Sequence, residues 1–303
     1  MEGREVNSRR TYYYSFKRWS DWAEERGCSP IPAVPLTFAM FLNQRIRSGV
    51  SYSTIKGYFY SVRYYHEFLG VADPCSTSLI TRLHEAAKRK CPKNTNRKDP
   101  VTPEEMRRIY NQLRATRSLV NLRLWVFVVL MFTGFFRYDE VAEVQKRDVE
   151  VSDDHMVIFL PRSKMDVLRE GDRVRIARTH LDTCPVAALV LYMEEASVVH
   201  DGEYLFRAIV TKRSGDVLRK TNDPISYDSV RRSFLGVLRQ VGIDSSRLGL
   251  HSMRAGGATK AANAGVADRV FQRHGRWKST KAKDGYVVDD FNKVLSVSKI
   301  LTI

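Results

Sequence analysis

The sequence has few cysteines and no long hydrophobic run, and both shortages exclude classes of protein. Its 303 residues include only four cysteines, Cys28, Cys75, Cys91 and Cys184, which lie far apart and form no Cys-x-x-Cys pair. This spacing argues against a disulfide framework and a zinc cluster, and it suits a reducing compartment. The longest apolar run, 124–136, is interrupted by a Thr-Gly pair and is too short to span a bilayer, so it predicts a buried core helix.

Acidic residues are also scarce relative to basic ones. There are 34 of them against 50 lysines and arginines, which gives a formal net charge of +16. Apolar residues make up 43% of the chain, which fits a folded core and excludes a disordered chain. The charge excess favours a polyanionic partner, nucleic acid first and an anionic membrane surface second. No basic amphipathic helix stands out, which disfavours a membrane, and the polar start predicts no signal peptide.

The positive charge is spread along the chain rather than gathered in one tail. Residues 1–100 carry a net charge of +8, and residues 101–303 carry another +8. Residues 88–100 hold six basic residues and two prolines but almost no apolar side chains, which is typical of a linker. Such a linker is either a solvated hinge or a segment that also touches phosphate. Two portions that can each approach a polyanion suit a clamp better than a globule with a basic tail.

The first ninety residues predict four short helices. Apolar side chains recur at three- and four-residue spacing over 12–23 and again over 38–45, after a proline-rich turn. A third helix is expected over 53–68, capped by Ser53 or Thr54, and a fourth over 78–90. Four short helices with polar connections indicate a small helical domain.

The remainder predicts a second, mostly helical domain. Residues 102–105, Thr-Pro-Glu-Glu, combine a cap, a first-turn proline and acidic residues, which is typical of a helix start. Two β-type runs, 155–160 and 172–177, are joined by a charged loop and predict a hairpin. Near the end, one helical stripe contains four apolar residues, Phe291, Val294, Leu295 and Leu301. An amphipathic helix must bury such a stripe, on its own domain or on a second copy.

Several polar residues of this second portion are ordinary when taken singly. Arg137 has Glu140 three positions later, which is a common spacing for a helical ion pair. His251 and Arg254 fall on one helix face, and such a pair arises about once by chance in a chain of this composition. A lone tryptophan or tyrosine is most often part of the core.

Taken together, the order and spacing of these residues resemble the tyrosine recombinase (phage integrase) family, closest to its Cre-like branch. The family pattern is Thr-Gly-x-Arg-x-x-Glu, a lysine on a β-hairpin, His-x-x-Arg, and a tyrosine nine residues after a further His or Trp. Matching residues occur in this order and the resemblance covers essentially the whole chain: Arg137, Glu140, Lys164, His251, Arg254, Trp277 and Tyr286. One departure is an extra residue between Gly134 and Arg137.

The resemblance implies a covalent mechanism. The Tyr286 phenol would attack a DNA phosphodiester and leave a 3′-phosphotyrosine and a free 5′-hydroxyl. Because the bond energy is kept in the phosphotyrosine, no metal or other cofactor is expected. Arg137 and Arg254 would hold the non-bridging oxygens bidentately, and the Trp277 indole would donate one further hydrogen bond. His251 would act as the base or as a phosphate donor.

Two further residues have implied supporting roles. Lys164 would be the general acid that protonates the leaving 5′-oxygen, with Arg162 and Arg169 as alternatives on the same loop. Glu140 would hold Arg137 or His251 in place, and a plain surface ion pair is its alternative interpretation.

The implied fold is mainly α with a small β-hairpin or sheet, arranged as a two-domain C-shaped clamp on duplex DNA with a specific target site. A SAM-like helical core-binding domain (1–87) and a basic linker (88–100) would precede a mixed α+β catalytic domain (101–288). Residues 289–303 would dock on a neighbouring protomer, which gives a dimer at each site and a homotetramer in the synaptic complex. An intracellular location is expected, in the nucleus of a eukaryote or the cytoplasm and nucleoid of a bacterium or phage host.

Basic side chains on the third helix, in the linker and around the site are the expected phosphate contacts. They are Lys56, Arg63, Lys88, Arg89, Lys90, Arg273, Arg276 and Lys278. For each one alone, a solvated side chain is the ordinary interpretation. Two other functions stay open: a type IB topoisomerase, which relaxes supercoils as a monomer with a similar set of residues, and a domesticated DNA-binding protein that has lost catalysis.

Overall fold

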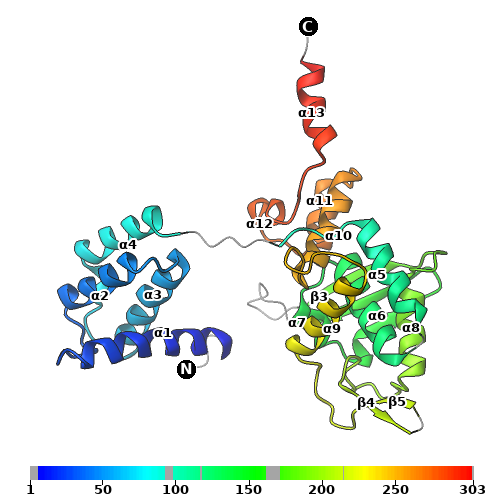
Figure 1. Ribbon diagram of the computed structural model, residues 1–303, viewed down its shortest axis with the longest axis horizontal. Coiled ribbons are helices and arrows are strands. Elements are labelled where there is room, and N and C mark those ends of the chain that lie inside the picture. Colours follow the sequence, from blue (N-terminus) through cyan, green and yellow to red (C-terminus); the bar gives the residue numbers. More distant parts are fainter. Residues whose placement is uncertain (1–5, 93–97, 117, 162–170, 214, 302–303) are drawn as a thin grey trace. The chain divides into compact units, whose positions relative to one another are not determined.

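The computed structural model describes residues 6–92, 98–116, 118–161, 171–213 and 215–301. The chain divides into two compact units, Met1–Arg97 and Lys98–Ile303 (Figure 1). Each unit has its own hydrophobic core. The division falls inside the basic segment 88–100.

The N-terminal unit consists of four α-helices and one short 3-10 helix (Figure 1). They are α1 (Val6–Glu24), α2 (Pro35–Arg47), α3 (Tyr52–Phe68), η1 (Pro74–Ser76) and α4 (Ser78–Lys90). The four predicted helices are therefore confirmed. The predicted cap of the third helix was wrong: α3 begins at Tyr52, and the Ser51 hydroxyl accepts the hydrogen bond from the Thr54 N–H at 3.3 Å.

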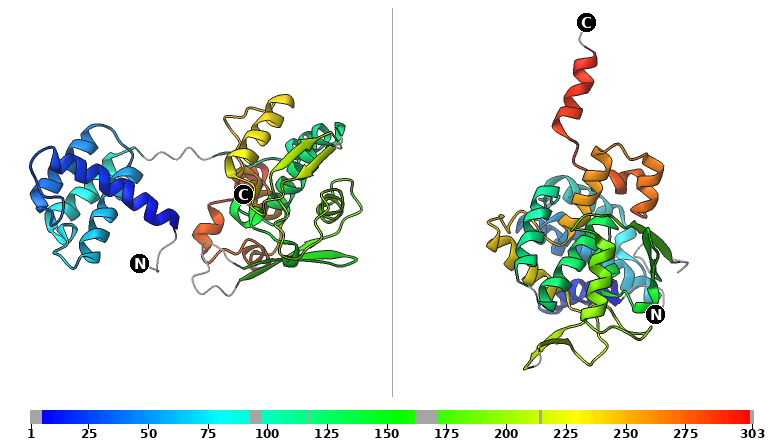
Figure 2. Two further views of the ribbon diagram at one scale, coloured as in Figure 1. Left: turned by 90° about the horizontal axis from the view of Figure 1, so that it is seen from below. Right: turned by 90° about the vertical axis from the view of Figure 1, so that its right-hand side faces the viewer.

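Aromatic side chains fill the core of this unit. The Trp19 ring meets Phe38 and Phe41 edge-on, with centroids 5.1 and 5.4 Å apart. The Trp19 indole N–H, although buried, donates to the Pro30 carbonyl at 3.1 Å, so burial leaves this donor satisfied. Helix α1 packs on α3 and α2 packs on α4, which closes the core (Figure 2).

The C-terminal unit is built around α6 (Leu119–Thr133), a helix that is apolar on nearly every side. Such a helix needs cover all round, and α5 (Pro103–Ala115), α8 (Pro185–Glu195), α9 (Tyr227–Gln240) and α10 (His251–Asn263) provide it (Figure 1). The other helices are α7 (Tyr138–Ala142), η2 (Lys146–Asp148), α11 (Asp268–His274), α12 (Thr280–Asp284) and α13 (Phe291–Ile300). The Thr102 cap of α5 is present as a full capping box.

Two small antiparallel sheets complete this unit (Figure 2). One has the order β1-β2-β3, formed by Val149–Val151, His155–Leu160 and Asp172–Ala177. Its β2–β3 pair has the predicted bounds, with His155 opposite Ala177. The second sheet, β4 (Ile209–Lys212) with β5 (Gly215–Leu218), was not predicted. A mainly helical fold with a small sheet is confirmed, whereas the clamp stays a prediction.

Helix α10 approaches its neighbours through two adjacent glycines. A Cβ on Gly257 would lie 1.9 Å from the Phe132 carbonyl oxygen on α6, and one on Gly256 would lie 2.2 Å from the Val101 carbonyl oxygen. Both obstacles are backbone atoms, so a side chain cannot be accommodated by a rotamer change. Gly257 therefore sets the distance between α10 and α6, and Gly256 sets the distance between α10 and the segment before α5.

We expect Gly257→Ala to lower the free energy of unfolding by about 2 kcal/mol, because the overpacking cost exceeds the gain of about 1 kcal/mol from helix propensity. Urea unfolding of the full chain measures this change. Gly236→Ala on α9 is the matched control, since a Cβ there meets nothing within 4 Å. That variant should be as stable as the wild type or slightly more so. Equal stability of the two variants would contradict the close packing.

Candidate active site

The turn between α6 and α7 carries the first arginine of the predicted site. Gly134 caps α6, and a Cβ there would lie 2.2 Å from the Phe136 ring, so the turn requires a glycine. Phe135 has a φ of +48°, a left-handed conformation that L side chains rarely adopt. The backbone then brings Arg137 to the N-cap position of α7.

The carboxylate of Glu140, in the first turn of α7, joins three arginines. Its Oε1 accepts from Arg137 Nη1 at 2.7 Å, and its Oε2 accepts from the Arg137 backbone N–H at 2.8 Å. Oε2 also accepts from Arg276 Nη2 at 2.9 Å and lies 3.6 Å from Arg254 Nη1. The Glu140 side chain is only 4% exposed, so these are buried ion pairs and not the surface pair of the alternative interpretation.

The pKa of Glu140 reflects a balance between burial and charge. Burial raises the pKa of this carboxyl, because desolvation penalises the charged form. The charge of Arg276, the hydrogen bond from the Arg137 N–H and the charges of Arg254 and Arg137 outweigh burial and hold the pKa below its ordinary value. One carboxylate is therefore shared among three guanidinium groups. This arginine cluster, formed by Arg137, Arg254, Arg276 and Glu140, keeps an excess of positive charge. Such an excess is what a phosphate requires of its binding site.

Arg254 is the most deeply buried of the three arginines, with a fully buried side chain. From its place in the first turns of α10, Nη1 donates to the Phe135 carbonyl and Nη2 donates to the Gly275 carbonyl at 2.8 Å. Its guanidinium carbon lies 5.1 Å from the Trp277 ring centroid and 4.9 Å from that of Tyr286. Burial, followed by the charge of Arg137, lowers the pKa of Arg254 to about 10, which leaves the group charged at neutral pH.

Trp277 and Tyr286 belong to a small aromatic cluster with Phe135 and Phe271. The rings of Trp277 and Tyr286 have centroids 5.5 Å apart, and the Thr259 hydroxyl on α10 donates to the Tyr286 carbonyl at 3.2 Å. Trp277 is 5% exposed, yet its indole N–H has no acceptor among the described residues. A buried donor without a partner costs about 1–3 kcal/mol, and an acceptor on a bound ligand or a water molecule would satisfy it.

The structure joins most of the predicted catalytic residues through these contacts: Arg137, Glu140, Arg254, Trp277 and Tyr286. His251 is the first residue of α10, three positions before Arg254, and its side chain is exposed. Lys164 and its alternatives, Arg162 and Arg169, lie outside the described residues.

The basic residues predicted to contact phosphate fall into two groups. Most are exposed: Lys56, Arg63, Lys88, Arg89, Lys90, Arg273 and Lys278. Among these, Arg63 pairs with Glu67 at 2.8 Å, so part of its charge is already compensated. Arg276 differs, because its side chain is only 5% exposed and its guanidinium donates to groups inside the protein. The sequence predicted Arg276 to be an exposed side chain that contacts phosphate, whereas the structure buries it inside the protein.

His274 is a residue of this region to which the sequence assigned no role. Its Nε2 donates to the Thr133 carbonyl at 2.7 Å, and its ring meets Phe135 edge-on with centroids 4.7 Å apart. Burial lowers the pKa of His274 and the nearby arginines lower it further, so the imidazole is neutral at physiological pH. No sequence signal indicates this contact, since the two residues are 141 positions apart.

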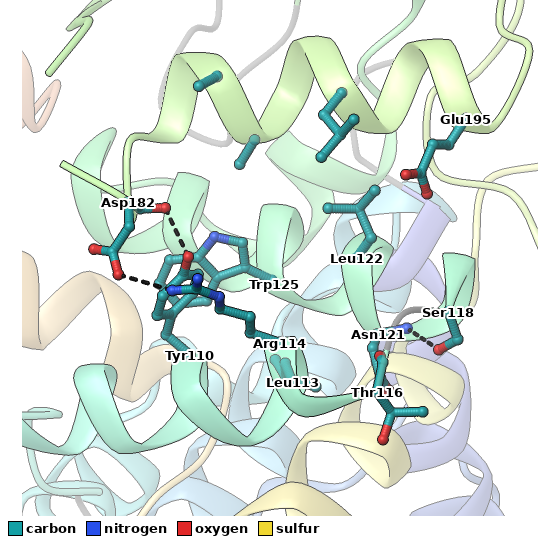
Figure 3. A pocket seen from close by; sticks show the side chains of 13 residues that line it. Tyr110, Leu113, Arg114, Thr116, Ser118, Asn121, Leu122, Trp125, Asp182 and Glu195 are labelled. Carbon is teal, nitrogen blue, oxygen red and sulfur yellow. Dashed lines mark hydrogen bonds and ion pairs between the residues drawn. The ribbon is translucent and has the colours of Figure 1, made fainter. Parts of the chain in front are cut away.

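A separate pocket lies between α5, α6 and α8 (Figure 3). Tyr110 on its wall donates to the Asp182 carbonyl at 2.9 Å, and Arg114 pairs with the Asp182 carboxylate at 3.3 Å. No residue that lines this pocket belongs to the arginine cluster. We therefore do not assign the pocket to the candidate active site.

Two other kinds of site were not found in the part of the chain that the structure describes. No group of three or more His, Cys, Asp or Glu side chains there is placed to hold a metal ion. None of the described helices combines the length and the apolar character needed to cross a membrane.

Comparison with known proteins gives the family. The chain is 26% identical over 285 residues to an integrase/recombinase xerD homolog of Selenomonas ruminantium, which covers 93% of this chain and 81% of the relative. Its fold is similar to the Tn1549 transposon integrase in complex with transposon right end DNA, with a TM-score of 0.64 and 15% identity over 99% of this chain and 95% of that one. It is also similar to a lambda integrase tetramer bound to a Holliday junction, with a TM-score of 0.59 and 19% identity over 95% and 73% of the two chains.

The family model agrees with these likenesses and with the order of the site residues. The model described as the phage integrase family matches residues 100–293, which is more than half of the chain and includes every described member of the arginine cluster. The protein therefore belongs to the phage integrase family, the tyrosine recombinases that act as site-specific DNA recombinases.

Proposed function

We propose that this protein cleaves and rejoins duplex DNA at a specific target site through a 3′-phosphotyrosine, as the recombinase or integrase of a mobile genetic element. One observation carries the proposal: Arg254 and Trp277, whose indole N–H is unpartnered, lie beside Tyr286, and Arg137 is joined to Arg254 through Glu140. The Arg254 guanidinium lies 4.9 Å from the Tyr286 ring centroid, so a phosphate held by this arginine is within reach of the phenol.

In the proposed reaction, the Tyr286 phenol oxygen attacks phosphorus, and the bond from phosphorus to the 5′-oxygen breaks. The phenol proton passes to a base, and the departing 5′-oxygen takes up a proton. Charge that develops on the non-bridging oxygens is stabilised by Arg137 and Arg254, and Trp277 donates to the same oxygens. The reverse attack by a 5′-hydroxyl on the phosphotyrosine rejoins the strand without an external energy source.

The remaining roles follow the family pattern. We assign protonation of the 5′-oxygen to Lys164, and to His251 either removal of the phenol proton or a hydrogen bond to the phosphate. Glu140 acts through Arg137 and is a positioning residue. Residues 1–87, 88–100 and 101–288 are the proposed DNA-binding domain, linker and catalytic domain, and exposed basic side chains in each are available to phosphate.

The test of this function is covalent capture. A duplex with a nick close to the scissile phosphate loses its short 5′-hydroxyl strand after cleavage, so the protein–DNA adduct cannot be reversed. We expect an adduct that survives denaturing electrophoresis and that forms in the presence of a chelator. Binding without any adduct would indicate a DNA-binding protein that lacks catalysis.

The stripe on the terminal helix supports assembly through α13. Phe291 and Val294 are 72% and 54% exposed, and Leu301 just beyond the helix is 73% exposed, so the chain's own unit does not bury them. Exposed apolar side chains in helical register favour a partner surface. We propose that residues 289–303 dock on a neighbouring protomer, with a dimer at each site and a tetramer in the synaptic complex.

Deletion of residues 289–303 is expected to leave DNA binding unchanged and to abolish synapsis and strand exchange. Gel-shift and recombination assays on paired target sites separate the two steps. Phe291→Ser combined with Val294→Ser should reproduce the loss, whereas Asn292→Ser on the same helix should not. Full strand exchange by the truncated chain would exclude docking of this helix on a neighbour.

A further inference from the structure

Two residues of the active-site region have an unusual backbone. Phe135 and Arg276 have φ values of +48° and +56°, and they belong to a set of three non-glycine residues with positive φ in the described chain. Such conformations persist where the surrounding structure holds them in place, and they gather at functional sites. The two residues are 141 positions apart, yet the Arg276 guanidinium donates to the Phe135 carbonyl at 3.0 Å.

The Arg276 side chain binds the turn that contains the extra residue between Gly134 and Arg137. Its Nη1 donates to the Gly134 carbonyl at 3.1 Å and to the His274 carbonyl at 3.0 Å. Its Nη2 donates to the Phe135 carbonyl and also to Glu140 Oε2 at 2.9 Å. Only a planar fork with several donors can satisfy these acceptors together, and the ammonium of a lysine lacks that geometry.

Arg276 and Arg254 converge on the same two acceptors. Both donate to the Phe135 carbonyl, and both face Glu140 Oε2, at 2.9 Å from Arg276 and 3.6 Å from Arg254. The Glu140 carboxylate in turn holds Arg137 through its other oxygen at 2.7 Å. Movement of the Arg276 guanidinium would therefore displace the Glu140 carboxylate, which Arg137 and Arg254 share.

We propose that Arg276 is a positioning residue of the active site, which holds the turn at Gly134 and Phe135 and fixes Glu140 so that Arg137 and Arg254 are held in place for the scissile phosphate. This inference rests on the proposed roles of Arg137 and Arg254. We assign Arg276 no contact with DNA in this role: its Nη1 and Nη2 donate to oxygens of the turn, of His274 and of Glu140, and its Nε is buried. Its effect is therefore on the cleavage step and not on DNA affinity.

A double-mutant cycle with Glu140 tests this role. Single-turnover cleavage of the nicked duplex at saturating protein is compared for the wild type, Arg276→Met, Glu140→Gln and the double variant. We expect Arg276→Met to slow cleavage by about 10- to 100-fold, because small displacements of reacting groups have effects of this size. Its Kd for DNA should stay within about twofold. In the Glu140→Gln background, the same change should cost less than about threefold, because the shared carboxylate charge is already absent.

Two further variants separate the effect of losing the Arg276 guanidinium from the effects of backbone strain and of losing a surface charge. Arg276→Gly suits the backbone, because glycine accepts a φ of +56° without strain. It should still cleave slowly, and it provides a folded alternative if Arg276→Met unfolds. Arg269→Met removes an exposed arginine of α11, the helix that ends just before Arg276, and should cleave like the wild type. Thermal melting of each variant checks its folding.

The pH dependence of the cleavage rate distinguishes a positioning role of Arg276 from a purely structural one, because a structural role would not change it. The groups that face Glu140 are Arg137, Arg254 and Arg276, and Asp172 lies near Arg276. Loss of Arg276 removes the largest charge that lowers the pKa of Glu140, so this pKa rises. As pH falls, cleavage by Arg276→Met should therefore decline at a higher pH than cleavage by the wild type.

Some results would overturn the inference. Cleavage by Arg276→Met or Arg276→Gly within about twofold of the wild type would exclude a positioning role, as would losses that multiply fully in the double variant. A failure of the proposed function looks different: Tyr286→Phe would then still form an adduct, or Arg137→Lys would cleave normally.

Discussion

The Tyr286→Phe variant is expected to form no covalent adduct with the nicked duplex, a loss of more than about 1000-fold in cleavage rate. The change removes one oxygen atom. The ring that remains keeps its place 5.5 Å from Trp277 and 4.9 Å from the Arg254 guanidinium carbon. Folding and DNA affinity should therefore match the wild type, so that the loss is confined to the nucleophile. Denaturing electrophoresis of labelled DNA measures the adduct, and fluorescence anisotropy measures the affinity.

Tyr227→Phe is the matched control for this variant. Tyr227 lies on α9, is 43% exposed and does not belong to the arginine cluster. Its phenylalanine variant should cleave like the wild type. If Tyr286→Phe still formed an adduct, another side chain would be the nucleophile and the central assignment would be wrong.

Arg137→Lys is expected to bind DNA nearly normally and to cleave about 100- to 1000-fold more slowly, the range found when one donor to a developing oxyanion is lost. The Arg137 guanidinium uses Nη1 to bind Glu140 Oε1 at 2.7 Å, and its other donors can still face a phosphate. A lysine keeps the charge but has one compact ammonium, which cannot span both partners. Single-turnover cleavage at saturating protein isolates this step from binding.

Arg107→Lys provides the comparison for an arginine outside the site. Arg107 on α5 pairs with Asp182 at 2.7 Å and is 47% exposed, so the same substitution there should leave cleavage unchanged. A wild-type cleavage rate for Arg137→Lys would reduce Arg137 to an ion-pair partner of Glu140. The buried pair would then serve stability alone.

Much of the fold was predictable because local periodicity and caps fix its elements. The regular apolar spacing in α1 and α2 indicates helices, and the apolar run of β2 followed by the alternation of β3 indicates strands. Thr102 as a cap, with the proline and acidic residues that follow it, predicted the start of α5, which the structure contains. The β4–β5 hairpin was missed because most of its side chains are exposed or half-buried, so its strands lack a contrast between two faces.

Candidate site residues were predictable from their order and spacing along the chain. His251 and Arg254 lie one helical turn apart, and Tyr286 follows Trp277 at a fixed interval, so local sequence is sufficient to suggest them. The grouping of Arg137 with Arg254, Trp277 and Tyr286 required the packing of α10 on α6. Gly257 of α10 permits that packing, because its lack of a Cβ allows the backbone of α6 to approach closely.

The sequence by itself determined the family pattern, the helical class and the excess of positive charge. It did not determine what any one of the 50 basic residues does. The sequence around an arginine does not tell whether its side chain is exposed to water or buried in the protein. Only the tertiary structure placed Arg276 inside the protein, where its guanidinium meets Glu140, a residue 136 positions away. That contact depends on backbone conformations at Phe135 and Arg276 that local propensity disfavours, and long-range packing supplies the stabilisation that they need.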